Sequence, residues 1–360
     1  MNIADAAWSW MHVLTKKRYE LLLKSYGNLG AALQNISEEM LRSLGCSEQT
    51  AMKALNRLAD FDPDRYAAHM QKLGVRLLSM AEEGYPRALR DIADPPVFLY
   101  VKGSIEILSS PSIALVGTRT MSMYGKRVTE RIVPPIVAAG MTTVSGLALG
   151  IDTAVANATL EVGGKTVAVL GHGLSRIFPS ENVKLAERIV AGGGAIVSEF
   201  PLDHPPGTHT FPARNRIIAG LSAATVVLEA PTESGALITA ELALDYGREV
   251  LAVPGDIFNP TYAGCHTLIR KGHAAVATSA DDILQTLGVQ SPEAGAPMSA
   301  YTPASADEAA LLNVLTPIPQ HIDVILERAS IDAAKTSATL TLLELAGGAK
   351  HLGNGMWVKV

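Results

Sequence analysis

The chain of 360 residues is longer than one ordinary domain and could hold two or three. Hydrophobic residues make up 48% of it and charged residues only 18%, which favours a well-buried α/β or helical body over disorder. The net charge of −5 argues against a protein coated with positive charge for unspecific nucleic-acid binding, but leaves room for a local basic pocket.

Cysteine usage and the N-terminus indicate the compartment. Only Cys46 and Cys265 are present, which resembles neither a disulfide framework nor a metal knuckle. The N-terminal stretch MNIADAAWSWMHVLTKK has an early acid and positive charge after its apolar run, the reverse of a secretory signal. No stretch approaches about 20 uninterrupted apolar residues. We therefore expect a cytoplasmic protein that does not span a membrane.

Residues 1–94 are predicted to form a small helical domain. Apolar residues recur there at spacings of three and four, interrupted by Gly27, Gly30 and Gly45. Ser37, followed by two glutamates, suits the start of a helix. Short helices joined by glycine turns are typical of SAM-like or helix-hairpin-helix DNA-binding modules. A plain packing or dimerisation domain also fits, and the lack of a basic hairpin tip favours it.

Residues 95–288 are predicted to form an extended Rossmann-like core. Short β-branched runs alternate with helix-length spacers, which indicates a mostly parallel, doubly wound α/β sheet. The runs are apolar throughout, so both faces of the sheet should be buried. Almost every run ends in Gly, Ser or Glu, at the edge where such sheets bind ligands. The runs are SIALVG, MTTVSG, KTVAVLG, AIVSE, ATVVLEA, EVLAVPG and AAVAT.

The C-terminal part of the chain predicts a linker and a second small domain. Residues 289–308 are rich in Ala, Pro and Ser, as linkers are. Residues 309–360 predict two or three helices and then a two-stranded wing with Gly353 and Gly355 at its turn, an order typical of winged-helix domains. From residue 289 onward four basic residues stand against seven acidic ones, which favours a protein contact over DNA binding there.

The loop after the first core strand, VGTRTMSMYGKR, has features of an anion site. Gly117 lets the backbone approach a ligand, and Thr118 and Arg119 add donors near the start of a helix. Four basic residues face one acidic residue between positions 111 and 131. The sequence is neither GxGxxG nor GxxxxGK[ST], which disfavours a dinucleotide and excludes a P-loop. Taken alone, the loop fits a phosphate site or a structural turn.

The next two strands end in VSGLALGID and VLGHGL. Asp152 fits an acid or base, or more simply a carboxylate that braces the neighbouring loop. His172 lies between two glycines, as solvated turn residues often do. No second histidine or carboxylate stands at metal spacing from it, so we predict no metal site.

The segment HTFPARNRIIAGLS places charged and aromatic side chains at a helix start. Arg214 suits bidentate phosphate binding, and Phe211 suits stacking on a base. Arg216 fits either a ligand or an internal ion pair with Glu199 or Glu229. The following loop, ESGALITAE, begins another helix with small residues that leave backbone N–H groups free. These loops predict one anion-binding edge without a nucleophile–base pair, which favours binding over catalysis.

These motifs resemble the DNA-processing protein A (DprA/Smf) family. The resemblance runs from residue 75 to 272, and the helical and winged regions are similar to accessory domains of that family. The matching segments, in chain order, are ALVGTR, YGKR, VSGLALGID, GGKTVAVLGHGL, FPSEN, SEF, FPARNRIIAGLS, SGALITAELAL, GREVLAVPGDI and LIRKG.

The resemblance implies a cytoplasmic homodimer, not an enzyme and without a cofactor, that binds single-stranded DNA without sequence specificity. It also implies that the protein protects incoming single strands and helps to load the RecA recombinase during natural transformation. Lys165 is a further basic candidate for the DNA site, although it precedes its strand. The positions that match the family's DNA pocket are Thr118, Arg119, Ser145, Gly146, Gly171, Phe211, Arg214, Asn215, Ser234 and Gly235.

Some positions depart from the family's pattern, and one rival function remains. Ala156 stands where a histidine is usual, and Thr208 lies where some members carry a basic residue, which concerns affinity more than fold. The rival is an enzyme of the nucleotide phosphoribohydrolase kind. PTESGALITAE has an outline similar to the loop of those enzymes, with Glu241 near its final position. A scaffold that works only through protein contacts is a third reading.

Overall fold

The computed structural model describes residues 2–290, 303–316, 319–329 and 331–359. The chain forms two units, Met1–Ser291 and Pro292–Val360. Most of the predicted linker, 291–302, lies outside the described residues. Its last three residues, 306–308, already belong to a helix, so the second unit starts earlier than predicted.

Six short helices form the N-terminal region, and each begins with a side chain that caps it. Asn2, Thr15, Asn28, Ser37, Ser47 and Asp62 each accept a hydrogen bond from a backbone N–H of the first turn. The helix start predicted at Ser37 is confirmed. The helices are α1 (Ile3–Met11), α2 (Lys16–Tyr26), α3 (Leu29–Gln34), α4 (Glu38–Ser43), α5 (Glu48–Ala59) and α6 (Pro63–Leu73).

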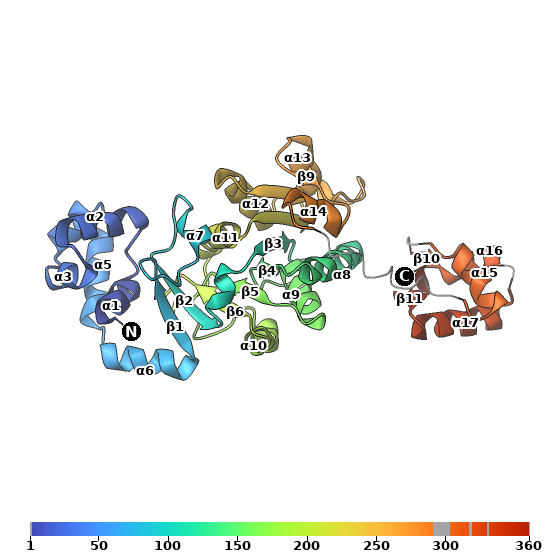
Figure 1. Ribbon diagram of the computed structural model, residues 1–360, viewed down its shortest axis with the longest axis horizontal. Helices are drawn as coiled ribbons and strands as arrows, with labels where there is room; N and C mark the ends of the chain where they lie inside the picture. The colour runs from blue at the N-terminus through green and yellow to red at the C-terminus, as the bar shows by residue number, and fades with distance from the viewer. Residues whose placement is uncertain (1, 291–302, 317–318, 330, 360) are drawn as a thin grey trace. The chain divides into compact units, whose positions relative to one another are not determined.

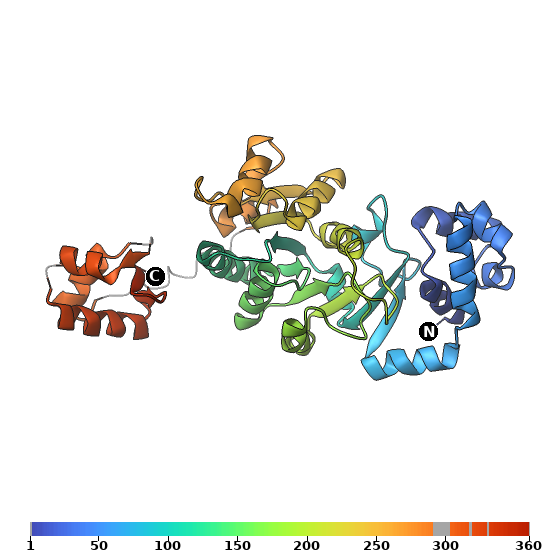
Figure 2. The same ribbon diagram turned by 180° about the vertical axis from the view of Figure 1, so that it is seen from behind.

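The N-terminal helices share a core with one end of the sheet. Trp8 is fully buried there and donates from Nε1 to the Leu29 carbonyl oxygen at 3.0 Å. Val97 and Phe98, at the start of a strand, belong to the same apolar cluster. Figures 1 and 2 show these helices beside the two strands at the edge of the sheet. This packing supports the interpretation as a packing domain, and a DNA-binding module stays a hypothesis.

One nine-stranded sheet forms the core, in the order β1-β2-β6-β5-β4-β3-β7-β8-β9. The seven strands numbered β3 to β9 are neighbours in this order and pair only in parallel with one another. This confirms the seven predicted runs and the mostly parallel sheet. The strands are β1 (Val75–Ser79), β2 (Phe98–Gly103), β3 (Ser112–Gly117), β4 (Thr142–Ser145), β5 (Thr166–Val169), β6 (Ala195–Ser198), β7 (Ala224–Glu229), β8 (Glu249–Ala252) and β9 (Ala275–Val276).

The first two strands were not predicted. β2 joins β6 antiparallel, and β1 joins β2 antiparallel at the sheet edge. Because β1 lies within residues 1–94, the helical region ends at Leu73 and the sheet begins before the predicted boundary. The five residues VRLLS are separated from helix α6 only by Gly74, so their apolar pattern is hard to separate from a continuation of the helix.

Both faces of the sheet are buried under helices. In β3, Ile113 and Leu115 belong to one apolar cluster, whereas Ala114 and Val116 belong to the other. The first cluster includes α8 (Met123–Ala138), α9 (Ile151–Glu161) and α14 (Ala280–Thr286). The second includes α7 (Arg87–Arg90), α11 (Thr210–Leu221), α12 (Gly235–Asp245) and α13 (Ala263–Arg270). Helix α10 (Val183–Ala191) packs near β5 and β6. The described part of the first unit also contains the short 3₁₀ helices η1 (Glu106–Ser109), η2 (Ser180–Asn182) and η3 (Pro260–Tyr262).

The second unit is a winged-helix domain, as predicted. Its wing pairs β11 with β12 antiparallel, and Gly353 and Gly355 lie between them with positive φ angles. Leu340 and Leu343 pack fully buried in a core with Trp357. The described elements are α15 (Ala306–Val314), β10 (Gln320–His321), α16 (Ile322–Ala329), α17 (Ala333–Leu345), β11 (Ala349–His351) and β12 (Met356–Lys359).

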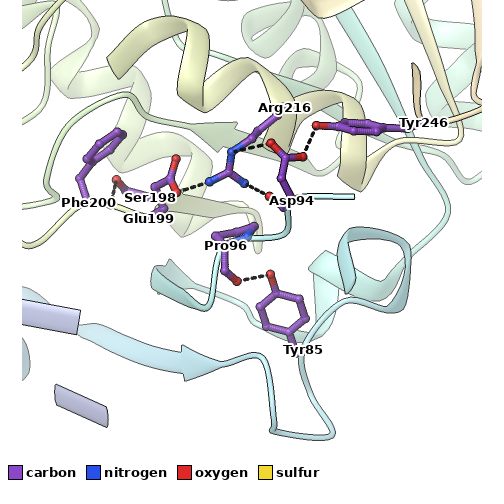
Figure 3. Close-up of polar contacts among 8 residues, drawn as sticks. All are labelled: Tyr85, Asp94, Pro96, Ser198, Glu199, Phe200, Arg216 and Tyr246. Carbon is purple, nitrogen blue, oxygen red and sulfur yellow. Dashed lines mark hydrogen bonds and ion pairs between the residues drawn. The ribbon is translucent and has the colours of Figure 1, made fainter. Parts of the chain in front are cut away.

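Arg216 on α11 connects distant segments of the first unit. Its Nη2 donates to Glu199 just after β6, and its Nη1 donates to the Asp94 carbonyl oxygen at 2.7 Å (Figure 3). The hydroxyl of Tyr246 donates to Asp94 Oδ1 at 2.5 Å. Burial raises the pKa of Glu199, and Arg216 opposes that rise. Arg216 therefore forms the internal ion pair that its sequence context left open, with Glu199 and not Glu229.

Replacing Arg216 with Met should destabilise the first unit by about 3 kcal/mol, because Glu199 would keep a buried charge without its partner. Urea unfolding followed by the fluorescence of Trp8 and Trp10, in a Trp357→Phe background, measures this. The double variant Arg216→Met/Glu199→Gln removes the unpaired charge and should regain much of the loss. Equal destabilisation of the single and double variants would contradict this account.

Candidate nucleic-acid interface

A cleft lies at the carboxyl-terminal edge of the sheet, where parallel strands place their ligand loops. Its volume is about 510 Å³, and it is lined from the loops after β3 and β7 and from the starts of α11 and α12. A smaller hollow of about 120 Å³ adjoins it, lined from the loops after β4 and β5. Arg119, Phe211 and Arg214 line both cavities. Loops from four strands thus converge on one site.

Arg119 and Phe211 form the exposed centre of this site. Arg119 is exposed in the loop after β3, and Phe211 is partly exposed in the first turn of α11. The guanidinium carbon lies 5.1 Å from the centre of the phenyl ring, within the range of a cation–π contact. A cationic fork beside an aromatic face suits a nucleotide, since one binds phosphate and the other stacks on a base.

Arg214, by contrast, is buried beneath the site with 5% of its surface exposed. Its Nη1 donates to the carbonyl oxygens of Gly146 at 2.6 Å and Val169 at 2.5 Å. Burial lowers the pKa of Arg214 to about 10, and Asp152 opposes the decrease, so the side chain stays charged at neutral pH. It ties the ends of β4 and β5 together, and direct phosphate binding by Arg214 stays a prediction.

Two neighbours hold Arg214 and the adjacent loops in place. Asp152 Oδ2 accepts from the backbone N–H groups of Gly146 at 3.1 Å and Ala148 at 3.3 Å, so it braces the loop after β4. Burial raises the pKa of Asp152, while Arg214 opposes that rise. Asn215 accepts from Arg214 Nε at 3.2 Å and donates to the Gly235 carbonyl oxygen at 3.1 Å. Polar contacts therefore run continuously from β4 to α12.

The remaining predicted residues differ in exposure. Thr118 is buried, and its Oγ1 accepts from the Thr120 N–H at 3.2 Å. Ser234 caps α12 by accepting from the Ala236 N–H at 3.3 Å, and Gly235 is open to solvent beside the cleft. Gly171 lines the hollow close to the phenyl ring of Phe211.

Two predicted residues line neither cavity. Ser145 is buried at the end of β4. Lys165 directly precedes β5, so it lies at the amino-terminal edge of the sheet, opposite the cleft. Lys165 therefore does not belong to this site, because residues before and after a parallel strand lie at opposite edges.

Sequence reasoning missed the apolar wall of the hollow. Leu149 and Phe178 line it and remain 41% and 51% exposed. The sequence signal that could have revealed this wall is Phe178 in FPSEN, an aromatic residue in the loop after β5. His172 is also buried there, with Nδ1 2.9 Å from the Gly173 carbonyl oxygen, so it is not a solvated turn residue.

Neither a metal-binding cluster nor a membrane-spanning helix is found in the described ranges of the chain. No three His, Cys, Asp or Glu side chains among those residues are grouped so that they could hold a metal ion. None of the described helices has the length and apolar character needed to cross a membrane.

Replacing Gly146 with Ala should destabilise the first unit by about 1–3 kcal/mol, because the added methyl group would overlap the guanidinium of Arg214. Gly235→Ala is the matched control, since nothing lies within 4 Å of its added methyl group. The control should be neutral or slightly stabilising at its helix position. Urea unfolding compares them, and similar losses in both variants would show that Arg214 is not held as described.

Comparison with known proteins places these features in a family. The model of DNA recombination-mediator protein A matches residues 76–288, and that of the DprA winged helix domain matches residues 292–355. Protein Smf of Escherichia coli (strain K12) is 42% identical over 281 residues, which cover 75% of this chain and 74% of that protein.

Two solved structures are similar as well. DNA processing protein A from Streptococcus pneumoniae has a TM-score of 0.67 and 34% identity, covering 79% of this chain and 98% of that one. DNA processing protein A from Helicobacter pylori, solved for its single-stranded DNA binding mode, has a TM-score of 0.53 and 30% identity. That match covers 59% of this chain and 95% of the Helicobacter chain. The chain described here therefore belongs to the DNA recombination-mediator protein A family.

Proposed function

We propose that this chain binds single-stranded DNA in the cleft and the hollow, without sequence specificity, and acts as a recombination mediator. The observation that carries the proposal is the exposed guanidinium of Arg119 over the ring of Phe211 at the mouth of both cavities. This pair can engage a phosphate and an unpaired base together. Every base offers a π-face, so little sequence preference is expected.

The charge distribution supports a local interaction with a flexible strand. The chain carries a net charge of −5, so it has no general attraction for nucleic acid. Arg119 is exposed, while the charge of Arg214 lies directly beneath the same surface. The Helicobacter pylori relative, whose structure describes a single-stranded DNA binding mode, shares this fold at 30% sequence identity.

Family membership also motivates a finer role. We propose that the protein protects incoming single strands and helps to load RecA during natural transformation, as a homodimer in the cytoplasm. Cys46 and Cys265 are both unpaired, as expected in a reducing compartment. The winged-helix unit contributes a protein contact in this proposal, because its charge is unfavourable for DNA.

Arg119→Ala should weaken single-stranded DNA binding about 10- to 150-fold, the equivalent of about 1.5–3 kcal/mol for one charge-assisted contact. The slope of log affinity against log salt should become shallower by about 0.7. Fluorescence anisotropy with a labelled oligo(dT) over a salt series measures both. Lys165→Ala, at the opposite sheet edge, is the matched control and should leave both unchanged. Equal effects of the two variants, or salt-independent binding, would refute the site.

The rival enzyme predicts that nucleoside monophosphates are cleaved to free base. Such an enzyme needs a glutamate facing a ribose, and Glu241 is exposed on α12 and lines neither the cleft nor the hollow. We therefore expect no free base from purified protein incubated with the four ribonucleoside monophosphates, followed by chromatography. Base release that is lost in Glu241→Gln would establish the rival activity.

A further inference from the structure

The loop between β8 and η3 exposes a large aromatic side chain that the cleft does not use. Phe258 is 89% exposed and its neighbour Ile257 is 79% exposed. The backbone around them forms a hydrogen-bonded turn. The N–H of Phe258 donates to Asp256 Oδ1 at 2.9 Å, and the N–H of Asn259 donates to the Asp256 carbonyl oxygen at 3.0 Å. This turn presents a phenyl ring to solvent.

Tyr124 links this loop to the one that carries Arg119. It lies in the first turn of α8, and its hydroxyl donates to the Pro254 carbonyl oxygen at 3.2 Å. Its ring packs edge-on against Tyr262, with centroids 5.4 Å apart, and yet 46% of the residue stays exposed. Tyr124, at the start of α8, and the loop that carries Phe258 therefore adjoin at the carboxyl-terminal edge of the sheet.

The strand order continues from the cleft towards these aromatic residues. In the sequence β5-β4-β3-β7-β8, the hollow lies at β5 and β4, the cleft at β3 and β7, and Phe258 follows β8. From β3 to β8 there are two interstrand steps, about 10 Å in total. The first three turns of α8, beside Tyr124, hold three basic residues and one acidic residue, Glu130. Asp256 is the one carboxylate in the loop 253–259, and its Oδ1 accepts from the Phe258 N–H.

We propose that Tyr124 and Phe258 form a second base-stacking platform, which lengthens the path of a single strand beyond the cleft to the end of β8. The proposal rests on the proposed function and extends it. The occupant is a nucleic-acid strand because the exposed rings lie at the same carboxyl-terminal edge of the sheet as Phe211, and basic residues of α8 follow soon after Tyr124.

The test uses the full chain with oligo(dT) of 4 and 12 nucleotides in fluorescence anisotropy. A 4-mer fills the cleft alone, whereas a 12-mer also reaches the platform. Phe258→Ala should weaken 12-mer binding about tenfold, within the range for loss of one stacked base, and leave 4-mer binding unchanged. Phe258→Trp keeps a π-face and should retain the affinity. Phe258→Leu should behave like the alanine variant, and Ile257→Ala, the exposed neighbour without a ring, should bind like the wild type.

Three results would overturn the platform. The first is full 12-mer affinity in Phe258→Ala or Phe258→Leu. The second is an equal loss for the 4-mer and the 12-mer, which would indicate general damage to the cleft. The third is a change of oligomeric state of Phe258→Ala in sedimentation velocity, which would assign the loop to a contact between copies of the chain. If the wild type binds neither oligonucleotide, the proposed function falls as well, which separates that failure from these three.

Discussion

The buried guanidinium of Arg214 is the interaction on which the whole site depends. It bonds to carbonyl oxygens at the ends of β4 and β5, and through Asn215 it connects to the start of α12. The bonds to the Gly146 and Val169 carbonyl oxygens are buried, and a buried polar group without a partner is costly. The position also requires Gly146, since any side chain there would overlap Arg214. The loops after β4, β5 and β7 consequently keep one relative geometry before any ligand arrives.

Three arginines near the same helix perform different tasks because their burial differs. Arg216 forms an ion pair with Glu199 and stabilises the fold, whereas Arg214 holds the strand ends and remains charged beneath the surface. Arg119 alone among the three is exposed, and it lies over Phe211. A chain with an overall negative charge thus still presents the exposed guanidinium of Arg119, beside an aromatic ring, at the carboxyl-terminal edge of the sheet.

The parallel core could be predicted from sequence because strands buried on both faces form continuous apolar runs bounded by glycines. Strand β1 escaped prediction since VRLLS follows a helix and pairs with residues about 25 positions further on. For the site, nine of the predicted residues line the cleft or the hollow, among them Arg119 and Phe211. The partner of Arg216 could not be chosen, because Glu199 and Glu229 both stand at the ends of strands and only packing distinguishes them. The exposure of Phe258 likewise depends on the loop's conformation, which no periodicity reports.

The central claim is that a single strand lies across the carboxyl-terminal edge of the sheet, over Arg119 and Phe211. Photocrosslinking of an oligonucleotide containing 5-iodouracil to the full chain, with the attached residues identified by mass spectrometry, tests this most directly. The account predicts attachment at Phe211, the ring that stacks on a base. Attachment confined to the amino-terminal edge around Lys165, or to the winged-helix unit, would contradict it.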